Sequence, residues 1–247
     1  MRRWLCAVVA AVVLAGCSSA QQDSPTVTVF AAASLRATFT ELGEVFEEQH
    51  PGTTVSFNFA GSSDLVAQLV QGAPGDVLAT ADTDTMGAAV DAGLVSDAPV
   101  DFAANVLTIV TAPGNPRRIS RFADLAGRDL QVVVCAPQVP CGSATEAAEQ
   151  ATGIMLRPVS EESAVTDVLG KVTSGQADAG LVYVTDARAA GDKVDVVPFA
   201  ESGAAVNTYP IATLAGSRDH RAAGQFVELV TGPRGRTVLA AAGFTTP

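Results

Sequence analysis

The stretch TVTVFAAASLRATFTELGEVFEEQ, residues 26–49, contains a pattern that later segments of the chain repeat. Residues 26–30 are rich in Val, Thr and Phe, which favour a strand. From Ser34 onward, apolar side chains recur at the spacing of one helical face, namely Leu35, Phe39, Leu42 and Phe46. The stretch therefore predicts a strand that leads directly into an amphipathic helix, with a serine at the junction.

The same alternation continues to the end of the chain. Further strand-like segments cover 54–59, 76–79, 106–111, 130–136, 179–184, 194–198 and 209–214, and helical ones cover 62–71, 82–92, 143–152, 163–173, 218–230 and 233–242. Strands separated by helices predict an α/β fold with mostly parallel sheets and helices on both faces. The length of 247 residues fits two lobes, although no true linker separates two halves.

Composition excludes several classes of protein. The chain is 48% hydrophobic, which is too apolar for a disordered protein. It has 15 Lys and Arg against 26 Asp and Glu, a net charge of −11, so we expect no nucleic-acid partner. Its two histidines, His50 and His220, stand in no metal-binding spacing, which argues against the common histidine-rich metal sites.

The N-terminus predicts export. Residues 1–16 combine two arginines with an apolar run that is too short to span a bilayer, as in a secretory signal. The run ends in Leu-Ala-Gly-Cys at residues 14–17, which resembles a bacterial lipobox and predicts a lipoprotein. Acyl chains such as palmitate on Cys17 would anchor the chain to the outer face of the cytoplasmic membrane. The alternative is an ordinary signal with a chance cysteine. Residues 17–25 then form a flexible tether.

Two cysteines remain in the body of the chain, Cys135 and Cys141. Outside the cytoplasm an isolated pair at this spacing predicts a disulfide. The alternative is a pair of thiolate metal ligands, but a zinc site needs further Cys or His nearby and the sequence has none there.

Three junctions between a strand and a helix carry small hydroxyl residues. They are AAASL at 31–35, AGSS at 60–63 and CGSA at 141–144. Helix N-termini offer unpaired N–H groups and partial positive charge, so several facing one cleft would bind an anion without Lys or Arg. The alternative for each serine is a helix N-cap. Tyr183, at the end of a strand-like segment, is either a core residue or a donor to a ligand.

Catalytic interpretations have less support. The sequence contains no GxSxG elbow and no Walker loop. A nucleophilic Ser34 or Ser62 would need a histidine base, and neither histidine is a plausible one. The Asp82-Thr83-Asp84 run fits the start of a helix better than a metal site. We therefore expect no enzyme and no cofactor.

Seven segments, in order along the chain, resemble the periplasmic molybdate-binding proteins of bacterial ABC uptake systems. They are AAASL at 31–35, FAGSS at 59–63, GAPGDV at 72–77, AD at 81–82, VPCG at 139–142, GLVY at 180–183 with Asp186, and YPIA at 209–212. The resemblance implies a two-lobed type 2 periplasmic binding protein with a ligand cleft between its lobes. Lobe 1 would comprise 26–104 and 209–247, and lobe 2 would comprise 105–208, with crossings near 104–106 and 206–209.

The resemblance also implies the ligand donors: the hydroxyls of Ser34, Ser62 and Tyr183 and the backbone N–H groups of Cys141 and Val165. Two positions depart from the family pattern. Cys141 replaces a small alanine, which leaves a backbone contact possible. Gly61 stands where a serine is common, which removes a hydroxyl but eases close backbone approach.

The function that follows is a monomeric solute-binding lipoprotein that captures molybdate, and tungstate as well, and delivers it to an ABC permease. A set of pure donors should prefer fully deprotonated tetrahedral oxyanions over hydrogen phosphate. Three alternatives remain: the same fold binding another oxyanion or a small organic acid, an enzyme on this fold, and a non-transport lipoprotein with a vestigial cleft.

Overall fold

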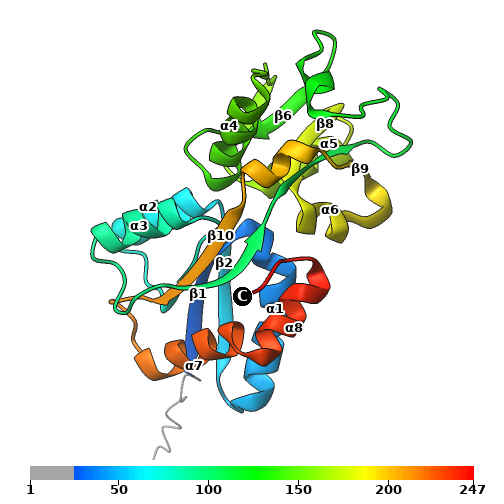
Figure 1. Ribbon diagram of the computed structural model, residues 1–247. Helices are drawn as coiled ribbons and strands as arrows, with labels where there is room; N and C mark the ends of the chain where they lie inside the picture. Colours follow the sequence, from blue (N-terminus) through cyan, green and yellow to red (C-terminus); the bar gives the residue numbers. More distant parts are fainter. Residues whose placement is uncertain (1–24) are drawn as a thin grey trace, which may run out of the picture.

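The computed structural model describes residues 25–247, which form two lobes joined at a narrow waist (Figure 1). Each lobe contains one five-stranded sheet, with strand orders β2-β1-β3-β10-β4 and β7-β6-β8-β5-β9. We use lobe 1 for the part built on the first sheet and lobe 2 for the part built on the second. The predicted signal sequence, Cys17 and the tether up to residue 24 lie outside the described residues.

Lobe 1 is covered on both faces of its sheet. Its strands are β1 (Thr26–Ala32), β2 (Thr54–Ala60), β3 (Val77–Ala79), β4 (Val100–Asn105) and β10 (Asn207–Thr213), and β10 runs antiparallel to both neighbours. Its helices are α1 (Arg36–Gln49), α2 (Ser62–Val70), α3 (Thr83–Asp91), α7 (His220–Thr231) and α8 (Pro233–Ala242). Alternate residues of β1 enter two different cores: Val29 packs with α1, α7 and α8, whereas Phe30 packs with α2 and α3.

Lobe 2 has a single core that spans both faces of its sheet. Its strands are β5 (Leu107–Thr111), β6 (Val132–Cys135), β7 (Ser160–Glu162), β8 (Ala179–Tyr183) and β9 (Asp195–Val197). Its helices are α4 (Pro140–Thr152), α5 (Val165–Thr173) and α6 (Val184–Ala190). The strands β6, β7 and β8 are parallel, and β5 pairs antiparallel with β8 and β9. The predicted α/β fold with mixed, helix-covered sheets is confirmed.

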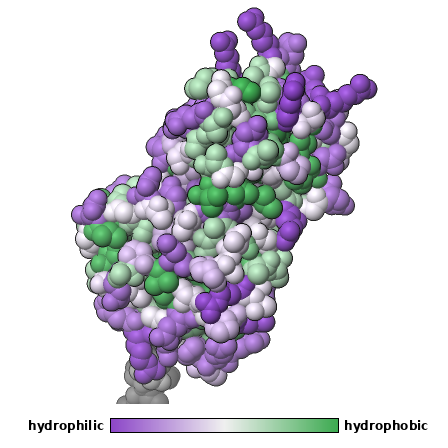
Figure 2. All heavy atoms as spheres, viewed as in Figure 1, coloured by the Kyte–Doolittle hydropathy of each residue, from purple (hydrophilic) through white to green (hydrophobic). Residues whose placement is uncertain are grey.

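The chain crosses between the lobes at two places. It leaves lobe 1 between β4 and β5, at Val106, and it returns after the short 3₁₀ helix η4 (Ala200–Ala204) through β10. On the face shown in Figure 2, apolar residues gather at this waist. Val206, just before β10, is 57% exposed. Because Asn105 pairs with Asn207, the two crossing segments lie side by side at the junction.

Two elements differ from the sequence-based expectation in ways that matter for the site. The helix predicted from residue 143 begins at Pro140, because a proline at the first helical position needs no N–H partner. This places Cys141 in the first turn of α4. The strand predicted from Tyr209 begins two residues earlier, at Asn207, because β4 provides a pairing partner that the sequence pattern did not predict.

None of the helices within residues 25–247 is long and apolar enough to cross a membrane.

Candidate functional site

A small cavity between the lobes brings together all five residues that the sequence predicted as ligand donors. Its lining residues are Ala32, Ala33, Ser34, Gly61, Ser62, Ala81, Val139, Pro140, Cys141, Ser163, Ala164, Val165 and Tyr183. None of these lining residues is charged. The cavity volume is about 20 Å³, little more than one water molecule needs. The lobes are therefore closed around a very small space.

Lobe 1 contributes two serine side chains at the carboxyl ends of adjacent parallel strands. Ser34 follows β1 in the 3₁₀ turn η1 (Ala33–Leu35), and Ser62 follows β2 as the first residue of α2. The N-cap positions of these helices are occupied by Ala32 and Gly61, so neither serine is the N-cap that the alternative interpretation required.

Each of these serine oxygens is held by a protein group. The Ala81 N–H donates to Ser62 Oγ at 3.0 Å, and Ser62 is only 1% exposed. Ser34 Oγ lies 3.1 Å from the Tyr209 hydroxyl. Since Ser62 Oγ already accepts a hydrogen bond, its own proton is left to donate into the cavity.

Lobe 2 contributes backbone groups from the first turns of two helices. Cys141 is the second residue of α4, and Val165 is the first residue of α5. The first N–H groups of a helix have no partner inside it, and no acceptor for either N–H is placed among residues 25–247. The predicted disulfide is present: it joins Cys135, at the end of β6, to Cys141, with their Cα atoms 5.6 Å apart. It therefore restrains the turn that presents the Cys141 N–H.

Tyr183 completes the lining from the end of β8. The residue is 1% exposed, and its hydroxyl has no hydrogen-bond partner within the part of the chain that the structure describes. Burial raises the pKa of Tyr183 well above its ordinary value, so the phenol keeps its proton at physiological pH. A buried hydroxyl without a partner is costly. This group is therefore the clearest indication that a ligand with an acceptor atom belongs in the cavity.

A buried carboxyl lies behind this tyrosine. Asp186 is on α6, and its Oδ2 accepts the Tyr183 N–H at 3.2 Å. Burial raises the pKa of Asp186 to about 7, and the Tyr183 hydrogen bond only partly opposes this rise. Asp186 does not line the small cavity.

Contacts between the lobes surround the cavity. On β10, the Asn207 side-chain amide donates to the carbonyl of Ala81 at 3.0 Å and to that of Pro140 at 3.3 Å, so it joins lobe 1 to lobe 2. A Cβ on Gly61 would overlap the Ser163 carbonyl oxygen of lobe 2. Sequence reasoning missed Asn207, which no local pattern marks. The sequence analysis did note that Gly61 permits a close approach of the backbone. It did not predict that the group approaching Gly61 is the Ser163 carbonyl of lobe 2.

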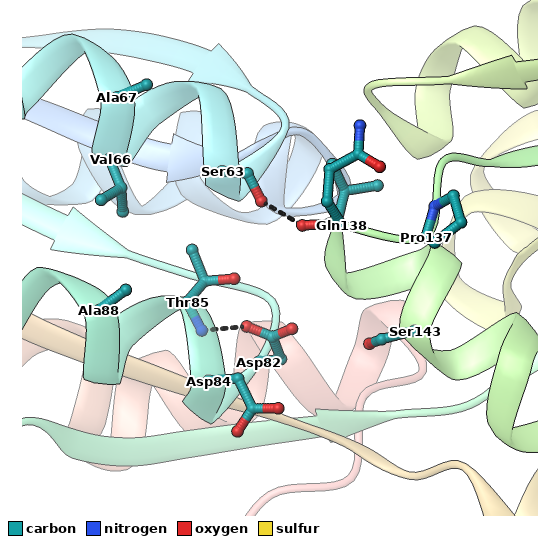
Figure 3. Close-up of a pocket in the computed structure, with 11 residues that line it drawn as sticks. Ser63, Val66, Ala67, Asp82, Asp84, Thr85, Ala88, Pro137, Gln138 and Ser143 are labelled. Atoms are coloured by element: carbon teal, nitrogen blue, oxygen red, sulfur yellow. Dashed lines mark hydrogen bonds between the residues drawn. The ribbon is translucent and has the colours of Figure 1, made fainter.

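A wider cleft of about 470 Å³ opens beside the cavity (Figure 3). Figure 3 shows Ser63 of α2 facing the 137–139 loop of lobe 2, where its hydroxyl donates to the Gln138 carbonyl at 2.8 Å. Asp82 lines the same cleft and accepts the Thr85 N–H at 2.8 Å, so it caps α3. Burial raises the pKa of Asp82. Within residues 25–247, no group of three or more His, Cys, Asp or Glu is placed to hold a metal ion.

Comparisons with known proteins agree on one family. The model of the bacterial extracellular solute-binding proteins matches residues 27–245. The molybdate-binding protein ModA of Mycobacterium tuberculosis is 53% identical over 226 residues, which are 92% of this chain and 87% of the relative. The ModA of Escherichia coli is 28% identical over 255 residues, 99% of this chain and 98% of the relative.

Solved structures show the same fold. The Azotobacter vinelandii periplasmic molybdate-binding protein has a TM-score of 0.78 at 23% identity, over 90% of this chain and 99% of that one. The sulfate-binding protein SubI of Mycobacterium tuberculosis has a TM-score of 0.73 at 22% identity, over 90% of this chain and 87% of that one.

Proposed function

The chain belongs to the bacterial extracellular solute-binding proteins, and from this premise we propose that it captures molybdate between its lobes and delivers it to an ABC permease. The 53% identity to a molybdate-binding protein supports this ligand. Tungstate, which has the same shape and charge, is expected to bind as well. The lobes would open to admit the ligand and close around it by hinge motion at the two crossings.

The observation that carries the proposal is the chemistry of the small cavity, which offers donors and no charged side chain. We propose that the hydroxyls of Ser34, Ser62 and Tyr183 and the N–H groups of Cys141 and Val165 hold the oxyanion. Hydrogen bonds from neutral donors to a charged acceptor are strong where water is excluded. A protonated ligand such as hydrogen phosphate would bring its O–H to a site where the two backbone N–H groups cannot accept it, so a fully deprotonated oxyanion is preferred.

Sulfate is the second candidate, since it is also tetrahedral and fully deprotonated. The likeness in fold to the sulfate-binding SubI supports this alternative. Molybdate and sulfate carry the same charge, so the donors cannot distinguish them by charge. Selectivity between them must come from the size of the closed cavity. A small organic acid has more atoms than a tetrahedral oxyanion, so it is a weaker candidate for so small a cavity.

We further propose that the protein is a monomeric lipoprotein anchored through Cys17 to the outer face of the cytoplasmic membrane. The family places the protein outside the cytoplasm. The lipobox-like residues 14–17 support the anchor. So does the 27% identity to YvgL of Bacillus subtilis, described as a putative ABC transporter substrate-binding lipoprotein. Replacing Cys17 with alanine should release the protein from the membrane fraction into the medium.

Thermal unfolding tests the ligand directly. The chain from residue 18 would be unfolded with molybdate, tungstate, sulfate or phosphate. Ligand at 1,000 times its dissociation constant adds about 4 kcal/mol, which for a chain of this size raises Tm by roughly 8–16 °C. A rise with molybdate and tungstate alone supports the site and its selectivity. A rise with sulfate as well keeps the site but removes the selectivity. No rise with any oxyanion contradicts transport of an oxyanion.

A further inference from the structure

Tyr209 is the second buried tyrosine at the junction of the lobes, and it does not line the cavity. It lies on β10, where the register with β4 shifts between Tyr209 and Pro210. Such irregularities turn a side chain away from the direction that regular pairing would give it. Aromatic rings surround the phenol, with centroid distances of 5.3 Å to Phe244, 5.9 Å to Tyr183 and 6.4 Å to Phe102. The ring is therefore fixed, and so is its hydroxyl.

That hydroxyl lies within hydrogen-bond distance of the Ser34 hydroxyl in the cavity, at 3.1 Å. Either oxygen could donate in this pair, and the choice determines what Ser34 offers to a ligand. If Tyr209 donates, Ser34 Oγ accepts and the Ser34 proton is free to point into the cavity. If Ser34 donated instead, its lone pairs would face the cavity and would repel an anion.

Two observations favour donation by Tyr209. Burial, together with the nearby Asp186, raises the pKa of Tyr209 above its ordinary value, so the phenol stays protonated, and a phenol is a stronger hydrogen-bond donor than an aliphatic hydroxyl such as that of Ser34. The other lobe 1 serine shows the same arrangement with a donor that cannot reverse, since Ser62 Oγ accepts the Ala81 N–H. With Tyr209 as the donor, the oxygens of Ser34 and Ser62 each accept a hydrogen bond from the protein. Each serine proton can then donate to a ligand in the cavity.

We propose that Tyr209 is a positioning residue: it donates to Ser34 Oγ and so directs the Ser34 hydroxyl proton toward the bound oxyanion. This role rests on the proposed function, because it requires an anion in the cavity. It also contributes to selectivity. A Ser34 hydroxyl that is free to rotate can turn a lone pair toward a protonated oxyanion, whereas one held by Tyr209 keeps its proton directed at the ligand.

A double-mutant cycle tests the proposal. Molybdate dissociation constants would be measured by titration calorimetry for wild type, Tyr209→Phe, Ser34→Ala and the double variant. A hydrogen bond that acts on a charged group corresponds to a roughly 10-fold or greater change in affinity. We expect Tyr209→Phe to weaken binding about 10-fold, and to add nothing when Ser34 is already alanine. Thr152→Val, which removes a hydroxyl that donates within α4, is the matched control and should bind like wild type.

Selectivity gives a second measurement that a purely structural role would not change. In Tyr209→Phe the ratio of molybdate to phosphate affinity should fall, while the Tm without ligand stays close to wild type. Additive losses in the cycle, or wild-type affinity in Tyr209→Phe, would overturn the role of Tyr209 and leave the proposed function intact. Absence of oxyanion binding by the wild-type chain would overturn the proposed function, and the inference with it.

Discussion

The two lobes present their candidate donors in different chemical forms. Lobe 1 uses the side-chain hydroxyls of Ser34 and Ser62, each with its oxygen held by another protein group. Lobe 2 uses the backbone N–H groups of Cys141 and Val165, together with the Tyr183 hydroxyl, which has no partner among the described residues. A side-chain donor depends on the identity of one residue, whereas a backbone donor depends on where the main chain is held. The two halves of the site should therefore respond to different kinds of substitution.

The largest effect is expected where the two halves meet. In Gly61→Ala the new Cβ would overlap the Ser163 carbonyl oxygen, so the lobes could not close fully. Overpacking costs about 1–3 kcal/mol, and at its upper end the loss of molybdate affinity is about 100-fold. Titration calorimetry measures the loss, and small-angle scattering should show a more open molecule in the presence of ligand.

Gly87→Ala is the matched control, because a Cβ at Gly87 meets open space. It should bind like wild type. If Gly61→Ala also binds like wild type, the tight contact between the lobes is not needed for binding.

The next largest loss of affinity is expected from replacing single side chains. These replacements test whether lobe 1 binds through side chains and lobe 2 through its backbone. Ser62→Ala removes a hydroxyl that offers a proton to the cavity, and a hydrogen bond to a charged group contributes about 1.5–3 kcal/mol. We expect a 10- to 100-fold loss of affinity. Val165→Ala keeps its backbone N–H and should change affinity by less than about 2-fold. Equal losses in the two variants would show that the lobes do not differ as proposed.

The disulfide tests whether lobe 2 depends on the position of its main chain. Replacing Cys135 and Cys141 together with alanine should lower stability by about 2 kcal/mol, the loop-closure value for so short a loop. Tm should then fall by roughly 4–8 °C. Molybdate affinity should fall as well, because the first turn of α4 loses its restraint. Loss of stability with unchanged affinity would mean that α4 holds the Cys141 N–H without the disulfide.

The smallest expected effect is the pH dependence of stability that Asp186 of lobe 2 causes. Asp186 has a pKa of about 7 when folded, above the value of about 3.9 expected when unfolded. Between about pH 3.9 and pH 7, Asp186 is therefore protonated in the folded state and ionised in the unfolded state. The free energy of unfolding falls as the pH rises through this range. Between pH 6 and 8 the loss is about 1 kcal/mol. Denaturant unfolding of wild type and Asp186→Asn measures it.

In that experiment the difference in stability between Asp186→Asn and wild type should grow with pH, because the amide cannot ionise. A constant difference across this range would contradict the raised pKa of Asp186.

The sequence predicted those features that depend on local pattern. The strand, serine and helix junctions located Ser34 and Ser62, and the alternation of strands and helices predicted the fold. The start of α4 at Pro140 was missed, because proline geometry at the first helical position sets it and the spacing of apolar residues does not mark it. The contacts of Asn207 and Tyr209 with residues far along the chain were not predictable, since they arise only when β10 returns to lobe 1.

The return of β10 also sets an order of folding. Ile211 pairs with Ala79, 132 positions earlier (211 − 79), whereas the lobe 2 sheet is complete at Val197, ten residues before β10 begins (207 − 197). Contacts so distant in sequence form slowly. In a chain that emerges N-terminus first, lobe 2 can therefore fold while the lobe 1 sheet still lacks the strand between β3 and β4. The cavity would then be the last part of the molecule to assemble, and β10 is the segment that completes it.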